Sequence, residues 1–443
     1  MSLADTLNLG CACQTLSLPR LREQLETTPA LGGLAARLAI SHPHLFSASA
    51  VFLDSSVALH IQQAVSAIER VIALPAWQAQ ALARAPATAA LSHGPAGVFM
   101  GYDFHLTDTG PRLIEINSNA GGALLNAALA RAHSACCEAF GELLDPPDAM
   151  RSLDAVFVGM FRSEWASQRG GAPLRTVLIV DDAPADQYLA PEFELFRELF
   201  AAHGLCALVA DAADLQWRNG ALTHPALPSG MAVDLVYNRL TDFYLQDPAH
   251  EALRLAHQAG AVVLTPHPRT HALFADKRNL VLLSDNDWLA RQGVSEPDRA
   301  LLQSVVPATQ RVDPDHADAL WAARRRLFFK PAAGFGARAA YRGDKLTRRV
   351  WSEILAGDYV AQSLVPPSER LVQVQGEPRL LKLDLRAYTY RAQVQLLAAR
   401  TWSGQTTNFR TDGGGFSPVV VLSGAPDPLS QAGHEAVQHF NVH

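Results

Sequence analysis

Two carboxylates and one amide have the residue types and the spacing of a metal site: Asp103, Glu115 and Asn117. Mg²⁺ binds hard oxygen ligands of this kind, usually a few side-chain oxygens together with the phosphates of a substrate. Two carboxylates held about 5 Å apart on neighbouring strands would repel each other unless a cation lay between them. These residues therefore predict a Mg²⁺ site, with a polar face exposed to water as the alternative.

A β-hairpin is the element that would bring these side chains together. From Val98 to Leu106 every second residue is apolar, a turn with Gly110 and Pro111 follows, and residues 113–117 resume as a strand. A hairpin centred on Thr109 would pair the following residues: Asp103 with Glu115, Gly101 with Asn117, Tyr102 with Ile116, and Phe104 with Ile114. One face would then be apolar, and the other would carry Asp103, His105, Glu115 and Asn117.

Lysine is rare in this chain, and its positions are informative. Of the 37 basic residues only four are lysines: Lys277, Lys330, Lys345 and Lys382. Because arginine serves as the general surface cation, each lysine is a candidate for work that needs a compact ammonium, such as phosphate binding. Codon bias with chance placement is the alternative.

The hairpin carries a resemblance to a known family. Asp103, the run Glu115-Ile-Asn117 and the small-residue turn 118–122 resemble the metal-binding end of ATP-grasp ligases. In most of that superfamily such a hairpin closes the catalytic domain, whereas here it comes first. The order is similar to the circularly permuted ATP-grasp proteins, such as eukaryotic-type glutathione synthetase and glutathionylspermidine synthetase. The resemblance covers residues 98–126 and 276–416 by motif, and the region between them by layout alone.

The resemblance implies two nucleotide lysines. Asp276-Lys277 matches a dipeptide on the helix that enters the catalytic domain, and it gives Lys277 to the phosphates. The strand ending in Lys330 supplies the second lysine, and the glycine loop after it, with Gly334 and Gly336, matches the lid loop. Backbone N–H groups of such a loop can fold over phosphates. One departure is that this loop contains no acid, whereas the glutathione synthetase loop carries a metal-binding glutamate.

The resemblance also implies an adenine hinge and two catalytic arginines. Residues 359–364 are expected to form an edge strand whose backbone near Gln362 and Leu364 binds the base. Asp-x-Arg at 384–386, an arginine at 400 and a glycine loop resemble ribosomal-protein-S6-type glutamate ligases. There the arginines hold the triphosphate and the developing charge, so Arg386 and Arg400 are the predicted catalytic residues. A plain hairpin turn is the alternative for the triple glycine.

Four further residues are predicted to bind substrate: Asn119, Arg239, Asn408 and Arg410. Arg239 follows a predicted strand of a β-α-β region, and open sheets bind ligands at the carboxyl ends of their strands. That region has apolar strands at 175–180, 206–210, 233–238 and 261–264, with helices at 192–203 and 250–258. The alternation implies a small parallel sheet with helices on both faces. No G-x-G-x-x-G follows its first strand, so a dinucleotide fingerprint is missing.

The predicted fold is α/β (α+β), namely a circularly permuted ATP-grasp fold with a Rossmann-like pre-ATP-grasp domain. Residues 1–170 are expected to hold an N-terminal helical region plus the metal-binding hairpin. Residues 171–270 are expected to form the α/β substrate domain, and residues 271–443 the nucleotide-binding subdomains. Residues 1 to about 90 are read as mostly helical, residues 123–144 as an Ala-rich helix, and residues 271–284 as a helix that contains the Asp-Lys pair.

Composition narrows the classes of function. A chain of 443 residues that is 49% apolar has room for two or three domains with hydrophobic cores. A net charge of -6 argues against nucleic acid or an anionic membrane as the main partner. No apolar run has membrane-spanning length and no signal peptide is evident, so a cytoplasmic location is expected. The five cysteines lack the spacing of a zinc site.

The predicted function is an ATP-dependent carboxylate-amine ligase that uses ATP and Mg²⁺, makes an acyl phosphate and releases ADP and phosphate. Its expected partners are small-molecule carboxylate and amine substrates, and a homodimer is a possible assembly. Two alternatives stay open. One is a catalytically degenerate ATP-binding partner protein, in keeping with the acid-free loop, and the other is a phosphotransferase to a non-carboxylate acceptor.

Overall fold

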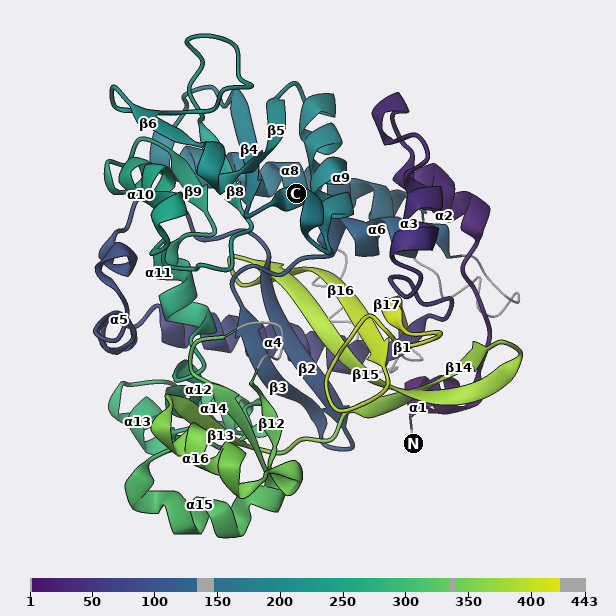
Figure 1. Cartoon of the computed structure of the whole chain (residues 1–443). Coiled ribbons are helices and arrows are strands. Elements are labelled where there is room, and N and C mark those ends of the chain that lie inside the picture. Colours follow the sequence, from purple (N-terminus) through teal and green to yellow (C-terminus); the bar gives the residue numbers. More distant parts are fainter. Residues whose placement is uncertain (1, 134–146, 335–338, 423–443) are drawn as a thin grey trace.

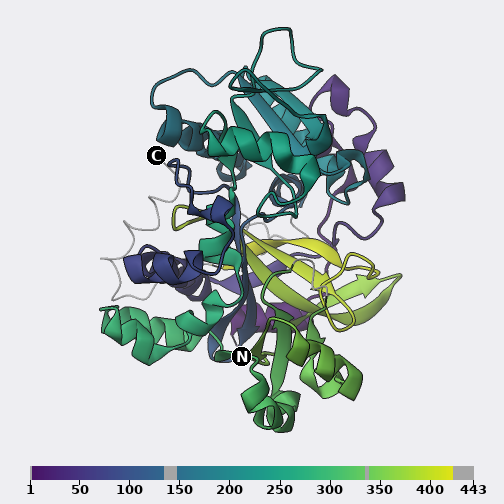
Figure 2. The ribbon, with the colours of Figure 1, turned by 60° about the vertical axis from the view of Figure 1, so that its left-hand side comes forward.

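The computed structural model describes residues 2–133, 147–334 and 339–422. The described chain forms three main sheets, of seven, four and four strands, and a two-stranded ribbon. In Figure 1 the sheet that contains β4 and β5 lies at the top, the large sheet lies in the middle, and the sheet that contains β13 lies at the bottom. Figure 2 shows the same three layers from a second side.

The large sheet joins strands from both halves of the chain. Its order is β1 (Val51–Asp54), β17 (Gly415–Leu422), β16 (Gln393–Trp402), β15 (Glu377–Tyr390), β2 (Met100–Thr107) and β3 (Gly110–Asn117), and β14 (Ser368–Val374) also pairs with β15. The predicted hairpin is therefore β2–β3. On its other side β2 pairs with β15, which comes from more than 250 residues later in the chain. The prediction of a mostly helical region over residues 1–90 missed strand β1. Its four residues pair with β17, a partner that local periodicity does not reveal.

The register of the hairpin is confirmed at its functional end and wrong at its turn. Asp103 pairs with Glu115, Gly101 with Asn117 and Tyr102 with Ile116, as predicted. Phe104 pairs with Leu113 instead of Ile114, because the register shifts by one residue after Asp103. A β-bulge of this kind leaves one residue out of the ladder. The Ile114 carbonyl is consequently directed to a partner outside the hairpin.

A parallel sheet forms in the middle of the chain, as predicted. Its order is β5 (Cys206–Asp211), β4 (Thr176–Asp181), β8 (Leu235–Asn238) and β9 (Val263–Thr265), all parallel. Val177 and Ile179 pack with residues of α8 (Pro147–Arg169) and α9 (Ala190–Ala202), whereas Leu178 and Val180 pack with α10 (Glu251–Gln258). Helices therefore cover both faces. The short ribbon β6–β7 (Gln216–Arg218, Ala221–Thr223) is an element that the sequence did not indicate.

The third sheet, which is called the lower sheet and, together with its helices, the lower lobe, corrects one prediction. Its order is β10 (Thr309–Arg311), β13 (Tyr359–Ser363), β11 (Leu327–Pro331) and β12 (Tyr341–Arg342), with α15 (Ala317–Ala323) and α16 (Arg348–Ala356) packed against it. The predicted edge strand at residues 359–364 is therefore an inner strand. Its second neighbour, β10, is a three-residue polar segment, which is too short to be recognised by its pattern.

Helices cover the outside of the large sheet and join the lobes. In the first part of the chain they are α1 (Leu3–Gly10), α2 (Leu18–Leu25), α3 (Leu34–Ser41), α4 (Ser55–Ile72) and α5 (Pro75–Leu82), and later α6 (Ala123–Ala132), α11 (Pro268–Thr270), α12 (Asn279–Leu283), α13 (Asn286–Arg291) and α14 (Glu296–Val305). The residues after α6 lie partly outside the described part of the chain. Among the described residues no single helix has both the length and the apolar composition to cross a membrane, and α4 with α5, bent by 75°, meets that criterion only as a pair.

The predicted helix over residues 271–284 is interrupted. Residues 271–275 form a π-helical turn, Asp276 has extended backbone angles, and α12 begins only at Asn279. The break is held by the Asp276 side chain, which accepts hydrogen bonds from the backbone N–H and the guanidinium of Arg278. The Lys277 N–H donates to the Ala332 carbonyl of the lower lobe. Lys277 therefore lies in a turn between two short helices.

A buried arginine fixes the N-terminal helix to the large sheet. Arg370 of β14 is 1% exposed, and its guanidinium donates to the carbonyls of Ala50 at 2.8 Å and Asn8 at 3.0 Å, and to that of Cys11. Asn8 and Cys11 lie at the end of α1, where the last carbonyls have no partner within the helix. A cation at a helix C-terminus is also favoured by the helix dipole. One side chain thus joins α1, β1 and β14.

We expect Arg370→Met to lower the free energy of unfolding by about 3 kcal/mol, because several buried carbonyls lose their donor and each unsatisfied group costs about 1–3 kcal/mol. The midpoint of urea unfolding at an unchanged m-value measures the effect. The matched control is Arg379→Met, on the neighbouring strand β15, where the arginine is exposed. An equal loss in both variants would contradict the role of Arg370.

Candidate active site

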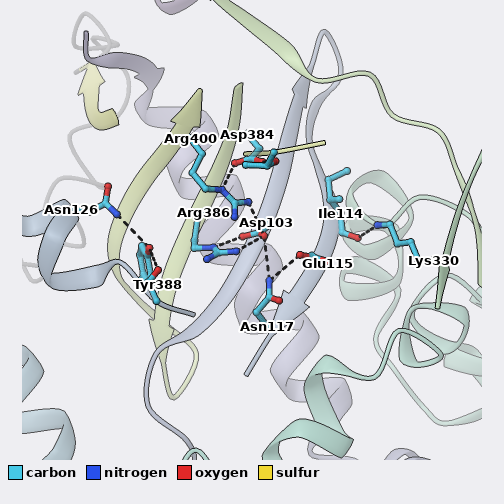
Figure 3. Close-up of polar contacts among 12 residues, drawn as sticks. Asp103, Ile114, Glu115, Asn117, Asn126, Lys330, Asp384, Arg386, Tyr388 and Arg400 are labelled. Atoms are coloured by element: carbon cyan, nitrogen blue, oxygen red, sulfur yellow. Dashed lines mark hydrogen bonds and ion pairs between the residues drawn. The ribbon is translucent and has the colours of Figure 1, made fainter. Parts of the chain in front are cut away.

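Asp103 is the centre of a buried ion network (Figure 3). Its Oδ1 accepts a hydrogen bond from Arg386 Nε at 2.6 Å, and its Oδ2 accepts from Arg386 Nη2 at 2.7 Å and from Arg400 Nη2 at 2.9 Å. Asp103 and Arg386 are directly opposite residues on β2 and β15. The two predicted catalytic arginines are therefore brought together around one carboxylate.

A second carboxylate completes this network. Arg400 Nε donates to Asp384 Oδ1 at 2.8 Å, and Asp384 and Arg400 are opposite residues on β15 and β16. Thr407, from the loop before β17, donates its hydroxyl to Asp384 Oδ2 at 2.7 Å. Two guanidiniums and two carboxylates thus alternate across three strands, and a loop residue closes the series.

The charges of this network stabilise one another. Burial by itself raises the pKa of the Asp103 carboxyl, but Arg386 and Arg400 outweigh burial and hold that pKa well below its usual range. Burial lowers the pKa of Arg386 and the neighbouring Asp103 raises it, with a net upward shift. Asp103, Arg386 and Arg400 are therefore held in their ionised forms, since each of these charges meets an opposite charge within hydrogen-bond distance.

Glu115 and Asn117 lie beside Asp103 on the hairpin, but neither is bound to an arginine of the described chain. The Asn117 amide nitrogen lies 3.2 Å from Asp103 Oδ2 and 3.3 Å from Glu115 Oε1, between the two carboxylates, where the sequence predicts a cation. The Glu115 side chain is 30% exposed, and its Oε2 is 4.0 Å from Lys277 Nζ. An amide can present either its oxygen or its nitrogen. Glu115 and Asn117 therefore fit a metal of the Mg²⁺ type.

Both oxygens of the third predicted ligand, Asp103, accept hydrogen bonds from arginines, so this carboxylate is shared with two guanidiniums. Within residues 2–133, 147–334 and 339–422, no group of three His, Cys, Asp or Glu side chains is arranged to hold a metal ion. A Mg²⁺ ion at this hairpin would therefore depend on Glu115, Asn117 and oxygens supplied by a substrate.

Lys330 reaches from the lower lobe to the hairpin. Its Nζ donates to the Ile114 carbonyl, at the bulge of β3, at 2.6 Å (Figure 3). It also donates to Gln362 Oε1 at 2.8 Å. The residue is 5% exposed, and burial lowers the pKa of its ammonium to about 8. Lys330 and Gln362, which lie on adjacent strands of the lower sheet, thus face the large sheet.

Lys277 approaches the same place from the turn before α12. Its Nζ donates to the Gly334 carbonyl at 2.8 Å and lies near Glu115. Gly334 is the first residue of the predicted lid loop, whereas Gly336 lies outside the described residues. Both predicted nucleotide lysines and the start of the glycine loop therefore meet at the hairpin.

The predicted hinge lies at the end of β13. The Leu364 N–H donates to the Arg326 carbonyl at 2.8 Å, so this backbone donor is used within the lower sheet. A cavity of about 480 Å³ is lined here by Ala323, Arg325, Arg326, Leu327, Ser363 and Leu364. The carbonyl groups of this segment remain the candidates for the predicted contact with a base.

The turn after β3 is fixed from three sides, and its glycines are required for space. Tyr388 donates its hydroxyl to the Gly121 carbonyl at 2.8 Å, and Glu192 of α9 accepts from the Gly122 N–H at 2.7 Å. A Cβ at Gly121 would lie 2.5 Å from Arg239 Nη2, and Gly122 adopts a φ of 97° against the ring of Phe416. The small residues therefore let the turn pass between the parallel sheet and β17.

Arg239 lies at this turn, as its position after β8 predicts. It is 7% exposed, and its Nη1 donates to Asn119 Oδ1 at 2.6 Å and to the Tyr237 hydroxyl at 3.2 Å. Its Nε is buried and has no partner among the described residues. Two of the four predicted substrate residues, Asn119 and Arg239, are thus in contact.

The other two, Asn408 and Arg410, do not join this group in the structure. The Asn408 amide nitrogen donates to the carbonyls of Ser403 and Thr406, and its oxygen accepts from the Arg410 N–H, so the side chain organises its own loop. Arg410 is exposed. A substrate role for either residue stays a prediction.

Several residues of the site have no signal in the sequence. Tyr388 and Ile114 lie in ordinary alternating strands, and Glu192 is one acid of a helix, although each holds the hairpin or its turn. Ser118 Oγ lies 3.0 Å from His271 Nδ1, and burial lowers the pKa of that imidazole to about 3. Asp384, Thr407 and Ser118, by contrast, lie within or beside the motifs that the sequence singles out.

The structure resembles solved structures, although no protein-family model and no curated protein matches the sequence. A glutathione synthetase-like effector (GSS30) from Globodera pallida, in its apo form, is 12% identical, with a TM-score of 0.55 over 91% of this chain and 97% of that chain. A putative gamma-glutamylcysteine synthetase from Methylobacillus flagellatus is 11% identical, with a TM-score of 0.45 over 81% of this chain and 84% of that chain. The first likeness shows that the chain has the fold of that glutathione synthetase-like protein, which confirms the predicted fold class. The permuted order and the Rossmann-like domain stay predictions.

Gly101 is required by the packing at the end of the hairpin. A Cβ at this position would lie 2.6 Å from Ala120 Cβ and 3.5 Å from Arg386 Nε. We expect Gly101→Ala to lower the free energy of unfolding by about 1–3 kcal/mol through overpacking. The matched control is Gly159→Ala in α8, where a Cβ meets nothing within 4 Å and the change should stabilise by about 0.5–1 kcal/mol. Chemical denaturation measures both, and a neutral Gly101→Ala would refute this packing argument.

Proposed function

We propose that this protein is an ATP-dependent ligase that joins a carboxylate to an amine through an acyl phosphate and releases ADP and phosphate. One observation carries the proposal: two lysines of the lower lobe and two arginines of the large sheet converge on the acidic hairpin of an ATP-grasp fold. Four cations and hard oxygen ligands around one space suit a triphosphate and attack on its terminal phosphoryl group.

In this proposal the lower lobe holds the nucleotide. Lys277 and Lys330 would donate to the phosphates, and each would exchange a present acceptor, the Gly334 or Ile114 carbonyl, for a phosphate oxygen. An ammonium suits this task because it is a compact charge with several donors. The base would lie at the end of β13, beside the cavity lined by Ser363 and Leu364.

The large sheet would do the electrostatic work of the reaction. Arg386 and Arg400 are fixed by carboxylates before any substrate arrives, so their remaining N–H groups need no reorganisation when charge develops. They would stabilise the charge of the transferring phosphoryl group and then the oxyanion formed when the amine attacks the acyl phosphate. Glu115 and Asn117 would hold Mg²⁺, which supplies charge neutralisation for the phosphates when bound.

The carboxylate and amine substrates would bind above the hairpin, toward the parallel sheet. Arg239 is a buried cation beside the Gly121–Gly122 turn, and Asn119 orients it. A guanidinium in this position can pair with a carboxylate of a small-molecule substrate in two parallel hydrogen bonds. Asn119 and Arg239 are therefore the proposed substrate-binding residues.

We expect incubation with ATP, Mg²⁺, the correct acid and hydroxylamine to give a hydroxamate together with an equal amount of ADP, because hydroxylamine intercepts the acyl phosphate. A panel of amino acids, short peptides and dicarboxylates identifies the acid by its stimulation of ADP release. The matched control is Arg386→Gln, which should reduce hydroxamate formation by about a hundredfold or more.

Each other outcome of this assay would indicate a different activity for this protein. Stoichiometric AMP and pyrophosphate would show that the intermediate is an adenylate and not an acyl phosphate. ADP release that no acid or hydroxylamine changes would favour phosphate transfer to another acceptor. Nucleotide binding with no turnover across the panel would favour a degenerate binding protein.

Lys330 gives the nucleotide step a pH signature. Its pKa is lowered from 10.5 to about 8, so in the free protein it is charged below about pH 8 and neutral above it. We expect kcat/KM for ATP, which reports the free protein, to fall by about tenfold per pH unit above this pKa, while kcat stays flat because a bound triphosphate keeps the ammonium protonated.

Two variants control the pH measurement. Lys330→Arg should remove the inflection, because a guanidinium stays charged throughout, although its shape should raise the KM for ATP. Lys345→Ala should leave the profile unchanged, since Lys345 is exposed at the outer turn 343–345. An unchanged inflection in Lys330→Arg would assign it to another group.

A further inference from the structure

We infer that Asp103 positions Arg386 and Arg400 for catalysis and does not ligate the metal, an inference that rests on the proposed function. The sequence groups Asp103 with Glu115 and Asn117, because all three are oxygen ligands on one face of a hairpin. The contacts of the folded chain distinguish them. Asp103 is hydrogen-bonded to two arginines, whereas Glu115 and Asn117 are bonded to none that the structure describes and can ligate a metal.

The first argument is the occupancy of the carboxylate. Oδ1 accepts from Arg386 Nε, and Oδ2 accepts from Arg386 Nη2, Arg400 Nη2 and, at 3.2 Å, Asn117 Nδ2. The Asp103 side chain is 2% exposed, whereas that of Glu115 is 30% exposed. A metal bound to Asp103 could use only the remaining lone pair of Oδ1, in a buried place beside the Arg386 guanidinium, whose positive charge would repel it.

The second argument is charge balance. Asp103, Asp384, Arg386 and Arg400 carry two negative and two positive charges, so the buried network is neutral as it stands. A divalent cation bound directly to this network would add two positive charges to it, which only groups outside the network could offset. Glu115 lies outside the network and is the carboxylate whose charge a metal and the phosphates can share.

The third argument is the direction that Asp103 gives to the arginines. The Nε and Nη2 of Arg386 both bind its carboxylate, so the plane of that guanidinium is set by two parallel hydrogen bonds. Arg400 is held at Nε by Asp384 and at Nη2 by Asp103. The Nη1 groups of both arginines donate to none of the residues that the structure describes, and they are the donors left for a substrate.

The experiment separates a metal ligand from a positioning residue by measuring metal binding itself. Binding of Mn²⁺, a paramagnetic substitute for Mg²⁺, is followed by electron paramagnetic resonance on the full chain with a non-hydrolysable ATP analogue. We expect Glu115→Gln to weaken Mn²⁺ binding by about tenfold or more, at least the loss seen for residues that only support a ligand. Asp103→Asn should change it by less than about twofold, although hydroxamate formation falls by about a hundredfold.

A double-mutant cycle tests the link to the arginine. Asp103→Asn leaves two guanidiniums with one carboxylate, and this variant can fold poorly for that reason alone. Asp103→Asn combined with Arg386→Gln restores the balance of charge, and we expect it to fold and to be no slower than Arg386→Gln by itself, since groups that act as a unit are not additive. Asp103→Asn combined with Glu115→Gln should multiply the two losses.

The outcomes are distinguishable. If the double variant Asp103→Asn/Arg386→Gln loses Mn²⁺ binding as fully as Glu115→Gln, Asp103 is a metal ligand and the inference is overturned, although the proposed function stands. If its reaction is much slower than that of Arg386→Gln, the positioning role is overturned. If the unaltered protein binds neither Mn²⁺ nor the ATP analogue, the proposed function fails first, and the inference fails with it.

Discussion

The ion pairing of Asp103 with Arg386 and Arg400 is the contact on which the centre of the molecule depends. It joins β2 to β15 and β16, strands that are brought together from opposite halves of the chain, and it lies where a charge is nearly shielded from water. Removing one partner of such a buried group leaves an uncompensated charge, at a cost of about 3–5 kcal/mol. The residues of the network therefore constrain one another, and they fix the two guanidiniums and the three strands relative to one another.

The two lobes of the site are in direct contact. Lys330 of the lower sheet bonds to the Ile114 carbonyl, which the bulge in β3 turns out of the hairpin ladder. Lys277 bonds to the start of the glycine loop and lies near Glu115. These bonds use the same ammonium protons that phosphates would take, so nucleotide binding would exchange partners and would not have to bring distant groups together. Preorganisation of this kind lowers the cost of ordering the site.

At the upper edge of the site the chain passes so close to other side chains that only glycine fits. The turn after β3 passes between Leu189, Arg239 and Phe416, and a side chain at Gly121 or Gly122 would overlap them. Glu192 then caps the first N–H groups of α6 from a different helix, and Tyr388 holds the Gly121 carbonyl. The turn is consequently fixed by contacts with other elements although it is made of small residues. Arg239 is placed beside it because β8 ends at this edge of the parallel sheet.

The sequence by itself determined the elements whose signal is local. Period-two alternation and a turn gave the hairpin and three of its four proposed pairs, and apolar runs separated by helices gave the parallel sheet. Scarce lysines and the Glu-x-Asn run pointed to residues that do meet in space. Tertiary structure alone decided which strands are neighbours, because pairing with β15, β10 or β17 is set by packing between distant segments. For the same reason it decided that Asp103 binds arginines while Glu115 lies near Lys277 and stays partly exposed, since the partner of a buried charge is fixed by the fold around it and not by its own neighbours in the chain.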